Sequence, residues 1–272
     1  MMKKYILIAL ALLLALSITS ALGEETEPTE YTCGDYNYIL LPDGTAEIIK
    51  YTGEASIVIV PSQIDNHTIV SIGYKAFYSC NSITYIELPN EISTIKPHAF
   101  SCCTSLVSIT LPECLNDIGF SAFMKCTSLF SITLPESICV IAPFTFAGCS
   151  SLTSVNVPNG LAYIGENAFY TCQSLASITL PDTLKAIGDE AFSCCISLSS
   201  IVLPNFLNTI GDEAFYLCKS LSTITLPKSL TNIGTNAFYL CGRLTITAPQ
   251  GSYAAQWCKQ NSIKCTYLDT KD

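Results

Sequence analysis

Cysteine and histidine are the side chains of this sequence with the most chemical scope, and the 272 residues contain 15 cysteines but only 2 histidines. Thiolates and imidazoles that surround one point bind zinc, and a thiol beside an imidazole makes a nucleophile. Eight of the cysteines instead recur every 23 residues, at Cys80, Cys103, Cys126, Cys149, Cys172, Cys195, Cys218 and Cys241. In stacked units, equivalent positions form a column with neighbours about 4.8 Å apart. This spacing predicts a line of small buried side chains and no metal site.

The other seven cysteines do not follow this period. Cys258 and Cys265 lie close together near the carboxyl end and are a candidate disulfide. The remaining five have no partner that the sequence identifies, and they are Cys33, Cys102, Cys114, Cys139 and Cys194. Because the total is odd, at least one thiol is free or pairs with another chain.

The inventory for enzymatic catalysis is poor. His67 and His98 are the only imidazoles available to activate a serine or cysteine nucleophile, and both are predicted in exposed loops. Carboxylates such as Glu166 and the pairs Asp189–Glu190 and Asp212–Glu213 follow glycines, whereas a glycosidase needs two carboxyls that face each other across a cleft. The G-x-S-x-G, P-loop, H-E-x-x-H and G-x-G-x-x-G motifs are missing from the sequence. We therefore predict no catalytic residues, no cofactor and no enzyme activity, with a hydrolase as the least favoured function.

Phenylalanine marks the framework that positions these residues. It recurs at the same 23-residue interval, three residues before each cysteine of the column, at Phe77, Phe100, Phe123, Phe146, Phe169, Phe192, Phe215 and Phe238. An unbroken period of this length predicts a solenoid, whose repeats bury their apolar faces only by stacking on one another. The phenylalanines and the cysteines are thus the predicted structural ladder.

Residues 152–174 show how one repeat is built. Val155 lies between Ser154 and Asn156, which predicts a short strand with one buried and one exposed face. A proline ends the strand, and a glycine then permits the chain to reverse. Residues 166–172 predict a single helical or 3₁₀ turn that directs the phenylalanine and the cysteine inward.

The pattern L-x-x-I-x-L-P-x-x-L-x-x-I-G-x-x-A-F-x-x-C, complete in residues 221–241, resembles the BspA-like leucine-rich repeat family with its 23-residue repeat. The resemblance covers residues 61–249. It implies a β-dominated α/β repeat solenoid with parallel strands, short helical or 3₁₀ turns and capping segments. In commoner leucine-rich repeats an asparagine or cysteine forms the ladder just after the strand. Here the cysteine that follows the phenylalanine takes that role, so partners of other repeat subclasses are not transferred.

Strand positions that point away from the core form a second set of columns. They are Tyr85, Glu87, Ser108, Thr110, Ser131, Thr133, Ser154, Asn156, Ser177, Thr179, Ser200, Val202, Thr223 and Thr225. Eight stacked repeats give a hydroxyl-rich face roughly 35–40 Å long, which is large enough for an extracellular protein or an extended polymer. The family resemblance implies binding or adhesion through this face. The alternative is that serine and threonine are small β-compatible fillers and the solenoid is a spacer without a ligand.

The two ends complete the predicted organisation. Residues 1–23 are predicted to be a signal peptide, because two lysines precede an apolar stretch too short to span a bilayer. Residues 24–60 are predicted to hold a disordered leader over 24–30 and a capping hairpin that turns at Asp43–Gly44; residues 250–272 are predicted to form a capping helix and tail. We expect a secreted or cell-surface protein without membrane insertion after cleavage. The net charge of −9 argues against a nucleic-acid partner.

Overall fold

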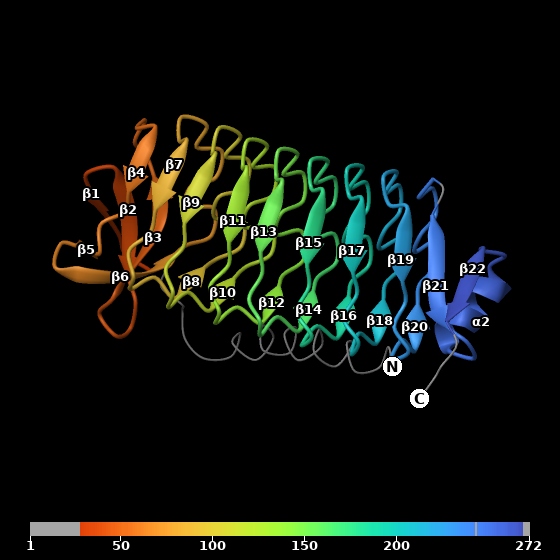
Figure 1. Ribbon diagram of the computed structural model, residues 1–272. Coiled ribbons are helices and arrows are strands. Elements are labelled where there is room, and N and C mark those ends of the chain that lie inside the picture. Colours follow the sequence, from red (N-terminus) through yellow and green to blue (C-terminus); the bar gives the residue numbers. More distant parts are fainter. Residues whose placement is uncertain (1–27, 243, 269–272) are drawn as a thin grey trace, which may run out of the picture.

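The computed structural model describes residues 28–242 and 244–268, which form an elongated β-solenoid of about ten turns (Figure 1). A typical repeat contributes a three-residue strand to one parallel sheet and a two-residue strand to another. The strands of the two sheets run in two rows along the length of the molecule. The predicted β-dominated repeat solenoid with parallel strands is confirmed.

The first sheet shows the predicted alternation of exposed and buried residues. Its strands are β4 (Ile57–Ile59), β7 (Tyr85–Glu87), β9 (Ser108–Thr110), β11 (Ser131–Thr133), β13 (Ser154–Asn156), β15 (Ser177–Thr179), β17 (Ser200–Val202), β19 (Thr223–Thr225) and β21 (Thr245–Pro249). The central residue of β13, Val155, is buried between two exposed neighbours. Hydrogen bonding divides these strands into four groups, β4–β7–β9, β11–β13, β15–β17 and β19–β21. The boundaries β9/β11, β13/β15 and β17/β19 are referred to below as seams.

A second sheet, which the sequence did not predict, lies across the core from the first. Its strands are β6 (His67–Ile72), β8 (Thr94–Ile95), β10 (Asp117–Ile118), β12 (Val140–Ile141), β14 (Tyr163–Ile164), β16 (Ala186–Ile187), β18 (Thr209–Ile210) and β20 (Asn232–Ile233). Most of these strands are two residues long, so they carry no alternation that a sequence pattern would reveal. Their isoleucines are buried, and the strands pair in parallel from β6 to β10 and from β12 to β20, with no strand pairing between β10 and β12.

The segment after each glycine position is a run of β-turns and not the predicted helical or 3₁₀ turn. Within residues 165–172, some N–H groups close turns inside the repeat, as Ala168 does to the Gly165 carbonyl at 3.3 Å. The N–H groups between them donate to the next repeat, as Asn167 does to the Asp189 carbonyl at 2.8 Å. Asn167 also has a left-handed φ of 54°, which a right-handed helix excludes. Stacking on the next repeat has replaced the local hydrogen bonds of a helix.

We call this layer the turn stack. It consists of residues 73–80, 96–103, 119–126, 142–149, 165–172, 188–195, 211–218 and 234–241. Its phenylalanine rings lie one above another at centroid separations of 5.2 to 5.6 Å, and all eight rings are buried. The column therefore runs unbroken through the core of the solenoid.

The cysteine column is buried beside the phenylalanines. From Cys103 to Cys241, each thiol donates to the carbonyl oxygen of the phenylalanine 26 residues earlier, at 2.9 to 3.2 Å. Cysteine thus fits the site as a small apolar side chain with one weak donor for a buried carbonyl. Cys80 begins the column and is only half-buried.

Thiol counting tests this arrangement. The buried thiols are those of Cys103, Cys126, Cys149, Cys172, Cys195, Cys218, Cys241 and Cys258. In the native protein we expect few groups to react with an aromatic disulfide reagent, because the reagent cannot reach them. After denaturation without reductant, about eight more thiols should react. A protein whose cysteines are nearly all oxidised under both conditions would contradict a column of free thiols.

The amino-terminal end extends the second sheet. Strands β1 (Glu30–Cys33), β2 (Tyr36–Leu40) and β3 (Ala46–Tyr51) form an antiparallel meander, and β5 (Gln63–Ile64) pairs with β6. Glu30, predicted in the disordered leader, belongs to β1 because it pairs with β2. The solenoid was predicted to start at residue 61, but β4 already joins the first sheet at Ile57. Residues 24–27 of the leader and the predicted signal peptide lie outside the described residues.

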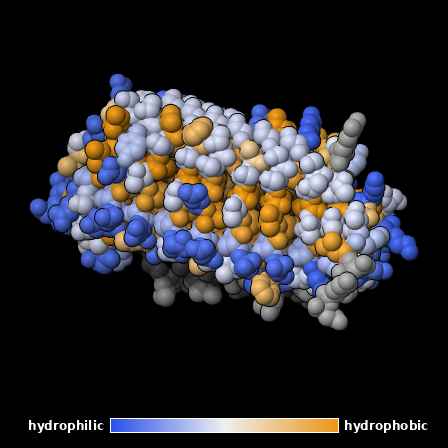
Figure 2. All heavy atoms as spheres, viewed as in Figure 1, coloured by the Kyte–Doolittle hydropathy of each residue, from blue (hydrophilic) through white to orange (hydrophobic). Residues whose placement is uncertain are grey.

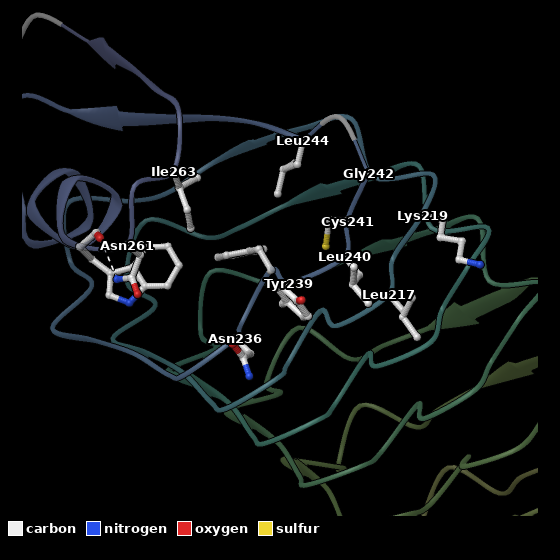
Figure 3. Close-up of a pocket in the computed structure, with 12 residues that line it drawn as sticks. Leu217, Lys219, Asn236, Tyr239, Leu240, Cys241, Gly242, Leu244, Asn261 and Ile263 are labelled. Carbon is white, nitrogen blue, oxygen red and sulfur yellow. Dashed lines mark hydrogen bonds between the residues drawn. The ribbon is translucent and has the colours of Figure 1, made fainter.

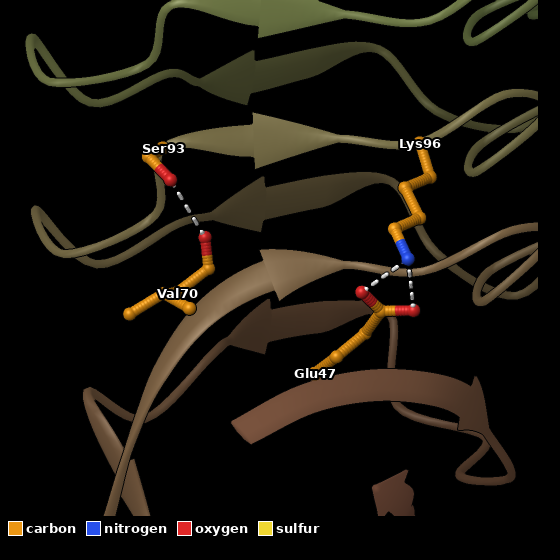
Figure 4. A network of polar contacts seen from close by, with 4 residues as sticks. All are labelled: Glu47, Val70, Ser93 and Lys96. Atoms are coloured by element: carbon orange, nitrogen blue, oxygen red, sulfur yellow. Dashed lines mark hydrogen bonds and ion pairs between the residues drawn. The ribbon is translucent and has the colours of Figure 1, made fainter. Parts of the chain in front are cut away.

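An ion pair ties this meander to the repeats (Figure 4). Glu47 of β3 is 4% exposed, and its carboxylate lies 2.7 Å from the ammonium of Lys96 two turns along. Ser93 adds a hydrogen bond of 3.3 Å to the Val70 carbonyl nearby. A carboxylate this buried is costly without a partner, so the pair fixes the position of the cap relative to the solenoid.

The carboxyl-terminal end is closed by a helix and a strand. Helix α2 (Tyr253–Gln260) begins at Ser252, whose side chain accepts a hydrogen bond from the Ala255 N–H at 3.2 Å. Trp257 is 7% exposed and meets the last phenylalanine, Phe238, edge to face at 6.0 Å. The predicted tail also contains β22 (Cys265–Leu268), which pairs in parallel with β21.

Candidate binding face

The structure gathers the residues predicted to bind a partner on one surface, which we call the first-sheet face. They occupy the first and third positions of strands β7 to β19, and only Tyr85 and Ser108 are half-buried while the others are exposed. Apolar side chains interrupt the hydroxyls at Ile57 and Ile59 of β4, which are 61% and 66% exposed, and at Val202 of β17, which is 78% exposed. The face therefore combines hydroxyls with scattered apolar contacts.

Polar side chains on this face contact one another between strands. The Tyr85 hydroxyl lies 3.0 Å from the Thr110 hydroxyl and donates to the Glu87 carboxylate at 3.2 Å. Further along, the Asn156 amide donates to the Thr133 hydroxyl at 3.3 Å. These contacts are exposed, so their donors and acceptors remain available to a ligand that displaces water.

The seam between β9 and β11 opens into a hollow of about 650 Å³. Ile109 and Ile132, the central residues of the two strands, form its floor, and Glu113 and Glu136 follow the carboxyl ends of the strands. Its sides carry the hydroxyls of Ser108, Thr110, Ser131 and Thr133. Figure 2 shows apolar surface between paler polar side chains across the middle of this face. An apolar floor with polar sides and two carboxylates suits a polar ligand that carries a basic group.

A second hollow, of about 740 Å³, lies between the last repeat and the terminal cap (Figure 3). Its walls come from turn residues such as Tyr239 and Leu240 and from Trp257, Asn261 and Ile263 of the cap. Sequence reasoning missed both hollows, because each forms between segments that are not adjacent in sequence or are hydrogen-bonded differently from their neighbours.

The two histidines are engaged with other groups. His67 begins strand β6, and its Nδ1 lies 2.8 Å from the Gly44 carbonyl oxygen, so it is not in the loop that was predicted. His98 lies in the turn stack between the rings of Tyr74 and Phe120, at centroid separations of 5.9 and 5.1 Å. Burial and the nearby Lys75 ammonium lower the pKa of His98. Among the described residues, no three histidine, cysteine or acidic side chains are grouped to hold a metal ion.

Cys258 and Cys265 come together in the cap. Burial and the neighbouring Cys265 thiol raise the pKa of Cys258 to about 12. Both thiols are free in the structure, so a disulfide between them remains a prediction.

Parallel strands that repeat every 23 residues, a ladder of buried phenylalanine and cysteine and a polar strand face define a leucine-rich repeat protein. The match to one family is extensive, since the model of the BspA type leucine-rich repeat region fits residues 50–159 and 139–264 with six copies. The chain belongs to this family. The family is a repeat scaffold and not a known class of enzyme.

Solved structures of bacterial repeat proteins resemble the chain. A leucine-rich repeat protein of T. pallidum is 32% identical, with a TM-score of 0.63 over 89% of this chain and 100% of that one. A leucine-rich cell surface protein of Faecalibacterium prausnitzii is 28% identical, with a TM-score of 0.58 over 82% of this chain and 77% of that one. Among curated proteins, none matches the chain.

Proposed function

We propose that the protein is a secreted or cell-surface scaffold that binds an extracellular protein or polymer through the first-sheet face. The observation that carries the proposal is the row of exposed hydroxyls along strands β7 to β19, which includes the hollow at the β9/β11 seam beside Glu113 and Glu136. Serine and threonine residues that served only as small β-compatible side chains would not require a recess at this place. The solved cell surface protein of F. prausnitzii, which shares the fold at 28% identity, supports the location. No helix within residues 28–242 and 244–268 is long and apolar enough to cross a bilayer.

The hollow favours a particular chemistry of partner. Serine and threonine hydroxyls donate and accept hydrogen bonds, so they match the amides of an extended peptide or the hydroxyls of a glycan. The carboxylates favour a partner with a basic group at this point. The overall charge of −9 also favours a positively charged partner. The alternative, a spacer without a specific ligand, predicts no difference in binding between the two faces of the solenoid.

Charge placed on the face tests the proposal. We expect the double substitution Ser154→Lys with Ser177→Lys to abolish binding to a panel of purified extracellular-matrix proteins, because two unpaired ammonium groups buried at an interface cost several kcal/mol. Both serines are exposed in the free protein, so the fold should change in stability by less than about 0.5 kcal/mol. Binding is measured by surface plasmon resonance and the fold by circular dichroism.

Two controls locate the site. Gln173→Lys adds a charge at an exposed position of the same repeat as Ser154, away from the strands, and should leave binding intact. Tyr170→Ala probes the turn-stack tyrosines and should also leave it intact. If Tyr170→Ala removes binding and the lysine pair does not, the site lies on the turn stack. If no member of the panel binds the wild-type protein, the spacer is favoured.

A further inference from the structure

The turn stack has an edge that the proposed binding face does not use, and its side chains are exposed or half-buried except at Ser121 and Asn167. In each repeat, the two residues after the glycine position form this edge. The N–H of the second residue of each pair donates to the carbonyl of the first residue of the pair in the next repeat. This bond is 3.3 Å from Lys75 to Pro97 and 2.9 Å from Glu213 to Thr235 at the other end. Equivalent bonds join the repeats between these ends. The edge is therefore a continuous ladder whose side chains keep register from repeat to repeat.

The amino-terminal half of this edge is aromatic and carries one ammonium group, that of Lys75. Tyr74 and Phe120 are 55% and 47% exposed, and His98 packs between their rings. The Lys75 ammonium lies 5.1 and 5.2 Å from the ring centres of Tyr74 and Tyr78. Large aromatic side chains that remain this exposed and are rigidly stacked are characteristic of protein interfaces.

The carboxyl-terminal half of the same edge is acidic. Glu166, Asp189, Glu190, Asp212 and Glu213 occupy the two edge positions of three successive repeats. Among the described residues, none of these carboxylates forms an ion pair. Burial and the repulsion of neighbouring carboxylates raise the pKa of Glu190. A basic surface laid against this row would relieve that repulsion.

The two halves match each other when one copy is turned end to end. Pro143 and Phe144, in the middle repeat of the edge, carry no charge. Three repeats to one side lies Lys75 and three to the other lies Glu213. A two-fold axis through the middle repeat places Lys75 of each copy opposite Glu213 of the other. The matched edge is on the order of 30 Å long, with an apolar centre and charged flanks.

We propose that this edge is the interface of an antiparallel two-fold dimer of the protein. Each complementary contact then occurs twice, which is the property of an isologous interface. The first-sheet face remains outside the contact, so the dimer presents two binding faces.

A charge exchange between Lys75 and Glu213 tests the dimer. These residues occupy the same turn position, with φ of 57° and 53°. Lysine and glutamate are therefore both already present at this position in the native protein, and each substitution should be compatible with the backbone. We expect wild-type protein at about 100 µM in low salt to sediment as a dimer and to dissociate as sodium chloride is raised. Lys75→Glu and Glu213→Lys should each weaken the dimer about tenfold or more, because like charges then face each other twice. An equimolar mixture of the two variants should recover a dimer, since one copy of each restores both pairs.

The controls separate this interface from others. Lys228→Glu, an exposed charge reversal in a loop away from the edge, and the first-sheet pair Ser154→Lys with Ser177→Lys should dimerise like wild type. Circular dichroism verifies that every variant is folded. A wild-type protein that stays monomeric up to about 1 mM in low salt, a dimer that both charge variants preserve, or a mixture that stays monomeric would each overturn the proposal.

Discussion

Replacement of Phe169 by alanine is expected to lower the free energy of unfolding by about 3–5 kcal/mol. The ring is fully buried and lies between Phe146 and Phe192 at centroid separations of 5.4 and 5.2 Å. Neighbouring repeats cannot move into the space, because their backbones are fixed by hydrogen bonds on both sides of the ring. Chemical denaturation monitored by circular dichroism measures the loss.

The effect should also spread along the chain. In a solenoid each repeat is stabilised mainly by its two neighbours, so hydrogen exchange should accelerate in the repeats of Phe146 and Phe192 together with that of Phe169. Phe130→Ala is the matched control, since that ring is 56% exposed and its loss should change stability little. An unchanged denaturation midpoint for Phe169→Ala would contradict a stacked core.

Alkaline pH should destabilise the fold steeply between pH 8 and pH 10. Burial raises the pKa of Cys103 and Cys149 from 9.0 to about 12, and that of Cys126 and Cys172 well above 9.0. The native thiols therefore stay protonated at a pH where the unfolded chain releases protons. A pKa that is raised in the folded state contributes stability below the unfolded value, and this stability is lost as the pH rises through 9 and above.

The expected loss of stability at alkaline pH is large, because every buried thiol of the column contributes the same kind of free-energy cost. At pH 10 each thiol of this kind costs on the order of 1 kcal/mol relative to neutral pH, so the column together removes several kcal/mol, which is comparable to the total stability of an ordinary domain. Urea denaturation in reductant at pH 7.5, 9 and 10 measures it. Cys149→Ala should reduce the difference between pH 7.5 and pH 10 by one thiol's share. Replacement of the exposed Cys114 by serine should not alter that difference, and a stability that is constant up to pH 10 would show that the thiols are not buried.

The parts of the fold that repeat were predictable, and the parts that depend on what lies next to a repeat were not. The period of Phe169 and Cys172 identified the core columns, and the alternation around Val155 identified the first sheet. The turn after Gly165 was mistaken for a helical turn, because a small residue followed by Ala168 and an aromatic ring fits either backbone. Only the next repeat, which accepts the Asn167 N–H, decides between them.

The candidate binding face was predictable as a set of positions but not as a shape. Ser108 and Ser131 follow from strand periodicity, and both lie where the pattern placed them. The hollow lies at a place where β9 and β11 are not hydrogen-bonded as strands, although their sequences, SIT and SIT, are identical. Whether two strands of identical sequence are hydrogen-bonded to each other cannot be read from the sequence of the strands alone. The aromatic cluster around His98 was missed for a similar reason, since its rings come from three successive repeats.

The seams bear on where the solenoid can bend. Hydrogen bonds run without interruption along the turn stack, whereas the first sheet is divided into four groups of strands. The turn stack is then a stiff spine, and the first sheet is a series of short plates that can separate slightly at β9/β11, β13/β15 and β17/β19. We expect bending to be easiest at the seams, because fewer backbone hydrogen bonds join the strands there than within each group. A solenoid pulled along its length is therefore expected to open at these three places before any repeat unfolds.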